Sequence, residues 1–193
     1  MNAAIKLAVG RMAGWLAEVY ALELGIRAED FVLSLPKERA RELLPAGCRS
    51  GVILVEQRGE ARVGLHLDPE DHCNEGTLVE ETSHLVCLAW HAARDLPISR
   101  LLLELQADID RFVFSRLIAL RRDRDALTHF ECFRWADGLD ADARERYEVA
   151  HERAHHYCRR LNDRFPRRAD TPALLSELRR FYRASPEEKL RAA

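Results

Sequence analysis

Apolar residues recur at intervals of three and four over most of the chain, and this spacing constrains the fold more than any other feature. In residues 4–24 the apolar side chains fall on one stripe of a helix: Ile5, Val9, Met12, Trp15, Leu16, Val19 and Leu22. The same spacing, with start and stop signals, predicts further helices over 36–44, 77–93, 99–121 and about 140–163, and from Thr171 onward. We therefore expect a mainly helical chain.

One segment departs from this period. Residues 52–55 form a run of branched apolar residues, Arg58-Gly59 stands at a turn, and apolar residues then alternate with other types up to Leu67. This pattern predicts an antiparallel β-hairpin over 51–67. Two strands alone are only marginally stable in water, so the apolar face of the hairpin must pack against the helices or against another chain. The expected fold class is mainly α (α+β), a multi-helix globular domain with one hairpin.

Length and composition limit the kind of protein. A chain of 193 residues with 47% hydrophobic residues can bury one core, so we expect a single domain over 1–193. Charged residues interrupt every apolar run near the start of the chain, which predicts no export signal and no membrane span. The cysteines form no CxxC pair, which favours reduced thiols and a cytoplasmic location; they are Cys48, Cys73, Cys87, Cys132 and Cys158. The strong preference for arginine over lysine is typical of a G+C-rich bacterial genome.

The segment His151-Glu152-Arg153-Ala154-His155 has the HExxH pattern and resembles the motif of the zincin metallopeptidases. The resemblance implies that His151 and His155 bind Zn²⁺ from one helix face and that Glu152 is the general base. The third ligand would come from a short set of candidates: Glu81, His84, His129 or Glu177. The alternative is that both histidines flank a buried stripe and make ordinary hydrogen bonds.

A second constellation is the pair of ExxH spacings, Glu81 to His84 and Glu148 to His151, each on an expected helix. Di-iron carboxylate bundles use two such pairs and one Glu from each of two other helices. Glu104 would supply one of these, and the other would be Glu18 or Glu23. The alternative is that Glu80 and Glu81 belong to the capped first turn after Thr77, and that Glu104 lies on a polar face with Arg100, Asp108 and Arg111.

The charges are unevenly distributed. Acidic residues outnumber basic ones in residues 1–110, basic ones prevail afterwards, and residues 153–183 are rich in arginine. Such a stretch suits phosphates or an acidic protein surface, although no known nucleic-acid-binding signature accompanies it. The alternative is a solvated face that pairs with the acidic half.

Three functional hypotheses follow. The leading one is a non-enzymatic cytoplasmic protein that acts through protein contacts, either with a partner or with a second copy at the hairpin edge. The second is a zinc-dependent hydrolase that uses Glu152 as catalytic base, with His151, His155, His84 and Glu81 as candidate metal ligands. The third is nucleic-acid binding through the arginine-rich helices. No Gly-rich phosphate loop and no GxSxG motif is present.

Overall fold

A computed structural model describes residues 2–57, 60–71, 74–118, 126–131 and 138–193. The longer helices, in chain order, are α1 (Asn2–Tyr20), α3 (Glu75–Ala92), α4 (Arg100–Leu117), α6 (Ala141–Arg164) and α7 (Thr171–Arg183). The shorter elements are η1 (Ala28–Phe31), β1 (Val32–Leu33), α2 (Lys37–Leu43), β2 (Gly51–Gln57), β3 (Glu60–His66), α5 (Thr128–Glu131), η3 (Arg168–Asp170) and α8 (Pro186–Ala192). The mainly helical α+β class is confirmed.

The strands form a three-stranded mixed sheet with the order β1-β3-β2. β2 and β3 pair antiparallel with Val52 opposite Leu65, as the hairpin pattern predicts. The expectation that this hairpin stands alone is wrong, because β1 pairs parallel to β3 with Val32 opposite Leu65. β1 has two residues, too few to show the alternation that marks a strand in a sequence. β2 is left as an edge strand.

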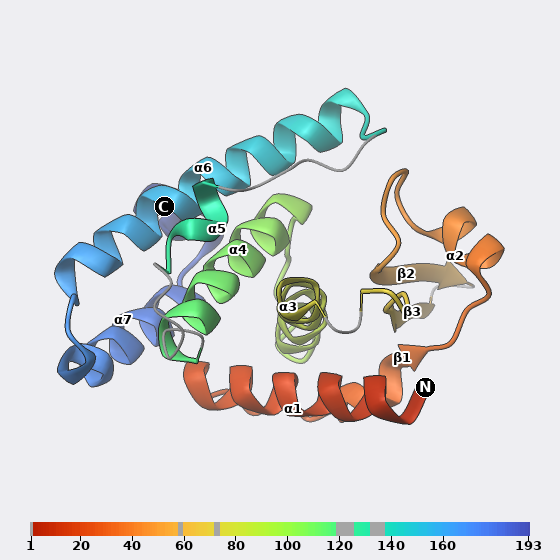
Figure 1. Cartoon of the computed structure of the whole chain (residues 1–193), viewed down its shortest axis with the longest axis horizontal. Helices are drawn as coiled ribbons and strands as arrows, with labels where there is room; N and C mark the ends of the chain where they lie inside the picture. Colours follow the sequence, from red (N-terminus) through yellow and green to blue (C-terminus); the bar gives the residue numbers. More distant parts are fainter. Residues whose placement is uncertain (1, 58–59, 72–73, 119–125, 132–137) are drawn as a thin grey trace.

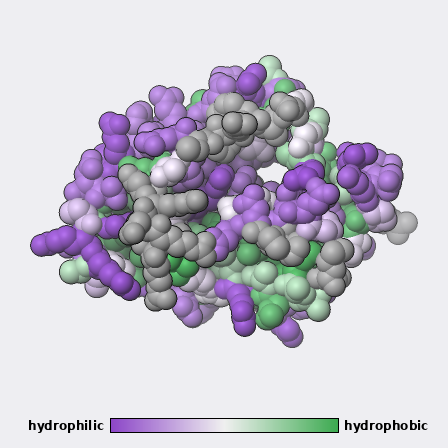
Figure 2. All heavy atoms as spheres, in the orientation of Figure 1, coloured by the Kyte–Doolittle hydropathy of each residue, from purple (hydrophilic) through white to green (hydrophobic). Residues whose placement is uncertain are grey.

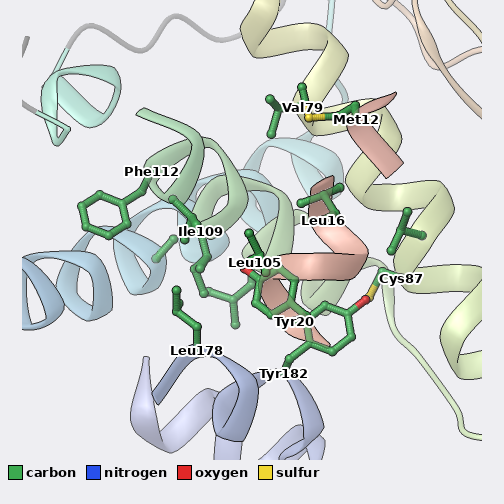
Figure 3. Close-up of a cluster of buried hydrophobic side chains, with 14 of the residues drawn as sticks. Met12, Leu16, Tyr20, Val79, Cys87, Leu105, Ile109, Phe112, Leu178 and Tyr182 are labelled. Atoms are coloured by element: carbon green, nitrogen blue, oxygen red, sulfur yellow. The ribbon is translucent and has the colours of Figure 1, made fainter. Parts of the chain in front are cut away.

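The long helices pack around one connected set of buried side chains, and α2 packs with β2 around a second, small cluster of Ala40, Leu44 and Ile53. In Figure 1, α1 runs along the bottom of the view, α3 is seen end-on in the centre, and α6 crosses above α4. Leu16, Val79, Leu105 and Leu178 belong to this core and come from α1, α3, α4 and α7, which Figure 3 shows converging. No helix in the described part of the chain is long and apolar enough to cross a membrane. The single domain and the cytoplasmic location stay predictions.

Helix starts follow the capping rules, with one difference that matters for the site. Ser99 caps α4 and Ser185 caps α8, as the sequence suggests. α3, however, begins earlier than the capping pattern at Thr77 predicts, because the side chain of Asn74 accepts hydrogen bonds from the N–H groups of Gly76 and Thr77. Residues 80 and 81 therefore lie in the second turn of α3, where capping no longer explains them.

Arginines of the 153–183 stretch donate to main-chain carbonyls at helix ends. Arg179 donates to the carbonyls of Val19 (2.9 Å) and Glu18 (3.1 Å), and Arg183 donates to that of Ala21 (2.6 Å). Two more arginines reach carbonyls near the end of α8: Arg153 that of Leu190, and Arg160 that of Ala192. Carbonyls in the last turn of a helix lack partners within the helix, so these bonds join α1 to α7 and α8 to α6. Nucleic-acid binding by this stretch stays a prediction.

A buried carboxylate joins three helices. Asp110 is 1% exposed and accepts hydrogen bonds from the hydroxyl of Tyr20, the hydroxyl of Ser83 (2.5 Å) and the amide of Gln106 (2.9 Å). Burial raises the pKa of Asp110 to about 6, although these three donors work in the opposite direction. The network connects α1, α3 and α4 inside the apolar core.

Replacing Asp110 by alanine should therefore destabilise the protein markedly. The change leaves two buried hydroxyls without their acceptor and the Gln106 amide with only its 3.2 Å hydrogen bond to the Tyr20 hydroxyl. We therefore expect a loss of about 3 kcal/mol in the free energy of unfolding. Urea unfolding measured by circular dichroism at pH 7 tests this. Asp163→Ala, at an exposed position of α6, is the control. A loss for Asp110→Ala no larger than that for the control would contradict a structural role for the network.

Candidate functional site

Ionisable side chains collect where α3 and α4 pack together and where α6 crosses α4. Residues three or four apart lie on one face of a helix, so each helix presents its members in line. We call the group the acid–histidine layer. It consists of Glu80, Glu81 and His84 on α3, Glu104, Asp108 and Arg111 on α4, and His151 on α6.

His84 lies between two carboxylates. Its Nδ1 is 3.5 Å from Oε2 of Glu81, and its Nε2 is 3.3 Å from Oε2 of Glu104. The three side chains are only 10–14% exposed, and the ring of His84 contacts a carboxylate at each of its two nitrogens. Burial alone would lower the pKa of His84, but Glu104 and Glu81 outweigh it and hold this pKa well above its usual value.

The second arm of the layer runs from Asp108 to His151. Nδ1 of His151 is 2.9 Å from Oδ2 of Asp108, and Nε2 is 3.3 Å from the carbonyl oxygen of Phe130. Burial lowers the pKa of His151, but the contact with Asp108 outweighs this and raises it. Both ring nitrogens thus face oxygen atoms, an arrangement that suits a charged imidazolium.

Arg111 connects Glu80 on α3 with the arm that runs from Asp108 to His151. Its guanidinium is 3.3 Å from Oε2 of Glu80 and 3.9 Å from Oδ1 of Asp108. Burial and the neighbouring charge of Glu81 raise the pKa of Glu80 to about 7, against the opposing effect of Arg111. The layer therefore contains a carboxyl group that changes its charge close to neutral pH, a property more common at functional sites than elsewhere.

The structure places the residues of the HExxH segment in different surroundings. His151 is turned toward Asp108, whereas the ring of His155 stacks on that of Phe130 with centroids 4.9 Å apart. Glu152 is exposed. In the described ranges no three side chains of His, Cys, Asp or Glu come together closely enough to hold a metal ion. Zinc binding by His151 and His155, with Glu152 as base, stays a prediction.

The ExxH hypothesis is only partly matched by the structure. Glu81, His84 and Glu104 lie together, as it requires. Glu148 instead lies 3.4 Å from Arg144 on its own helix with 53% of its side chain exposed. The two remaining candidates are exposed: Glu18 and Glu23.

Sequence reasoning missed the role of Asp108, which it assigned to the polar face of α4. The signal was present, because Asp108 follows Glu104 by four residues and so lies one turn further along the same face. What the sequence does not show is that α6 covers this part of α4 and brings His151 to Asp108.

Two further side chains border the layer. Burial raises the pKa of the Cys48 thiol to about 11, and the charges of Glu81, Glu80 and Glu104 add to the effect. Burial and the same three carboxylates raise the pKa of Tyr147. Figure 2 shows that the surface is hollowed between α6 and the sheet, and that hydrophilic residues gather around this hollow. The layer thus lies in a polar part of the molecule with side chains from α6 and from the loop before β2 nearby.

Comparison with models of known protein families, with curated proteins and with solved structures found no match.

His129 on α5 lies beside the second arm, and its environment favours the neutral imidazole. Its Nδ1 is 3.3 Å from the carbonyl oxygen of Ala126, and its ring lies against that of Phe130. Burial lowers the pKa of His129 from 6.5 to about 4, only partly offset by Asp108. Protonation of His129 is therefore easier in the unfolded chain than in the folded one.

This difference predicts that acid weakens the fold through His129. The contribution is fully present above pH 6.5 and is lost as the pH falls toward about 4. Between pH 7 and pH 4.5, His129→Gln should lose about 2 kcal/mol less unfolding free energy than the parent chain. Urea unfolding at both pH values measures this. His156→Gln, at an exposed histidine of α6, should behave like the parent chain, and equal losses in all three chains would refute the assignment.

Proposed function

We propose that this chain binds a divalent metal ion in the acid–histidine layer, with Nε2 of His84 and the carboxylate of Glu104 as the first two ligands. One observation carries the proposal: these groups are buried and 3.3 Å apart, and a second carboxylate, Glu81, faces the other ring nitrogen of the same histidine. Ligands about 2.1 Å from one ion, at the angles of tetrahedral or octahedral coordination, lie about 3.0 to 3.4 Å from each other. The spacing therefore fits two ligands of a common ion.

Glu81 has the position of an orienting group. A metal-binding histidine usually gives the N–H of its other ring nitrogen to a carboxylate or a carbonyl, which fixes the ring and strengthens it as a ligand. Glu81 Oε2 faces Nδ1 of His84, the nitrogen that the proposed ion does not use. This arrangement supports Nε2 as the ligand.

The charge of the layer also supports a cation. Four carboxylates lie in it, and Arg111 is the single permanently charged cation among its members. Buried carboxylates need protons, cationic partners or metal ions. In the free chain, protons on the histidines and on Glu80 supply this charge. A bound ion would replace the proton on Nε2 of His84, so affinity should rise with pH.

The remaining ligands would come from a turned carboxylate and from water. Glu80 and Glu81 lie in the same turn of α3, so a change of side-chain rotamer could bring either carboxylate to the ion. Ions such as Mg²⁺ and Mn²⁺ also keep several water ligands. A bound ion would lower the pKa of its water and would polarise a carbonyl or phosphoryl oxygen. Metal-assisted hydrolysis is therefore the reaction class that we propose for the site.

Metal titration of the metal-free protein tests the proposal. By isothermal titration calorimetry at pH 7.5 with Mn²⁺ and Zn²⁺, we expect one ion per chain. His84→Asn and Glu104→Gln should weaken binding at least about tenfold because each removes a ligand. His155→Ala and Glu148→Gln should leave it unchanged, since both residues lie outside the layer.

Two outcomes would overturn this assignment. One is the lack of measurable binding of either ion. The other is loss of binding in His155→Ala together with full binding in Glu104→Gln, which would favour the zincin hypothesis. Glu104→Gln preserves the size of the side chain, and a thermal melt of each variant shows whether a loss reflects unfolding.

A second candidate function is contact with another protein chain at the edge strand β2. Leu54 is 61% exposed and Val55 is 43% exposed, and neighbouring residues of a strand point to opposite faces. An edge strand also presents unpaired N–H and C=O groups that can pair with a strand of another chain. We propose self-association through β2 as the simplest form of the protein-contact hypothesis.

Self-association is tested by sedimentation velocity over a range of protein concentrations. We expect a dimer that Leu54→Lys converts to a monomer, because a charged side chain at the edge opposes strand pairing. Leu7→Lys on α1, where the leucine is 57% exposed, is the matched control and should remain a dimer. A chain that stays monomeric at every concentration would exclude this form of contact.

A further inference from the structure

A surface cavity of about 210 Å³ lies between α2 and the loops that flank the sheet. Its lining includes Lys37 and Arg41 from α2, Cys48 and Arg49 from the loop before β2, and Asp68 from the loop after β3. Neither the proposed ion site nor the β2 edge uses this cavity.

Two cations of the cavity have no acidic partner among the residues that the structure describes. Lys37 and Arg41 are four residues apart on α2 and form no ion pair with the described residues. Arg39, on the same helix, is in contrast 2.6 Å from Glu42. The positive charge of Lys37 and Arg41 is therefore available to a ligand.

The acidic groups near the cavity are already engaged. Arg49 is held by Glu70 and Asp71, at 2.6 Å from each. The carboxylate of Asp68 accepts a hydrogen bond from the backbone N–H of Glu70 at 2.8 Å and keeps its negative charge. The lining therefore carries the two cations of α2 against one carboxylate, that of Asp68.

Cys48 relates the cavity to the acid–histidine layer. Its side chain lines the cavity, and the charges that act on its thiol are those of Glu81, Glu80 and Glu104. Cys48 is thus the residue that connects the cavity with the carboxylates of the proposed metal site. The thiol itself is kept neutral by burial, which raises its pKa to about 11, so it adds no charge that would repel an anion.

We propose that this cavity binds the anionic group, a phosphate or a carboxylate, of the ligand on which the chain acts. Lys37 and Arg41 supply the countercharge, and the planar guanidinium of Arg41 is suited to two parallel hydrogen bonds with either group. The anion subsite itself does not require a metal. Only the role of its ligand as substrate rests on the proposed function.

Calorimetric titration of the metal-free protein with inorganic phosphate, and separately with acetate, tests the subsite and distinguishes the two anions. We expect binding that weakens at least about tenfold in the double variant Lys37→Ala, Arg41→Ala, and that weakens with added salt because the contact is ionic. Arg39→Ala removes a paired arginine from the same helix and should bind like the parent chain. A preference for phosphate or for acetate names the group.

Absence of binding by either anion, or full binding in the double variant, would overturn the proposal. Mn²⁺ titration of the double variant tests the metal site independently. The variant should bind Mn²⁺ like the parent chain, because neither substituted residue belongs to the acid–histidine layer. Anion binding in a chain that binds no metal would confirm the subsite and remove its link to hydrolysis.

Discussion

The requirement that buried carboxylates find partners organises the centre of this molecule. Helix α4 places Glu104, Asp108 and Asp110 in the interior of the molecule. An unpaired carboxylate there would cost several kcal/mol of folding free energy. Each receives partners from a different neighbour: α3 brings His84, α6 brings His151, and α1 brings Tyr20. The helices that surround α4 are therefore placed by polar contacts as well as by apolar packing.

These carboxylates differ in the kind of partner that they have. Asp110 accepts three hydrogen bonds from neutral donors, although Oε1 of Gln106 in the same network forms none. Glu104 instead faces an imidazole that a second carboxylate, Glu81, also contacts. A histidine between two buried carboxylates is the arrangement on which the proposed ion site rests.

Regular periodicity in the sequence predicted the helices and the strands 51–57 and 60–66 well. Two features were missed for different reasons. β1 depends on a contact between distant segments, because it is a strand only through its pairing with β3. The start of α3 is a local miss, because Asn74, a stronger capping residue three positions before Thr77, caps the helix.

The candidate site was predictable only in part. Glu81 and His84 were identified from ExxH spacing and Glu104 as the extra Glu of a di-iron bundle, but the same spacing favoured Glu148 equally, which the structure turns to Arg144. The HExxH segment had the better-known pattern, yet spacing along one helix cannot show that Asp108 contacts His151 while the ring of Phe130 stacks on His155. The ligands of an ion usually come from several helices, whereas a sequence motif describes residues of one helix only.

The most direct measurement is an anomalous difference map from crystals of the protein grown with Mn²⁺ or Co²⁺. We expect a peak within coordination distance of Nε2 of His84 and of the carboxylate of Glu104. A peak shared by His151 and His155, or no peak at any ordered position, would contradict the proposed ion site.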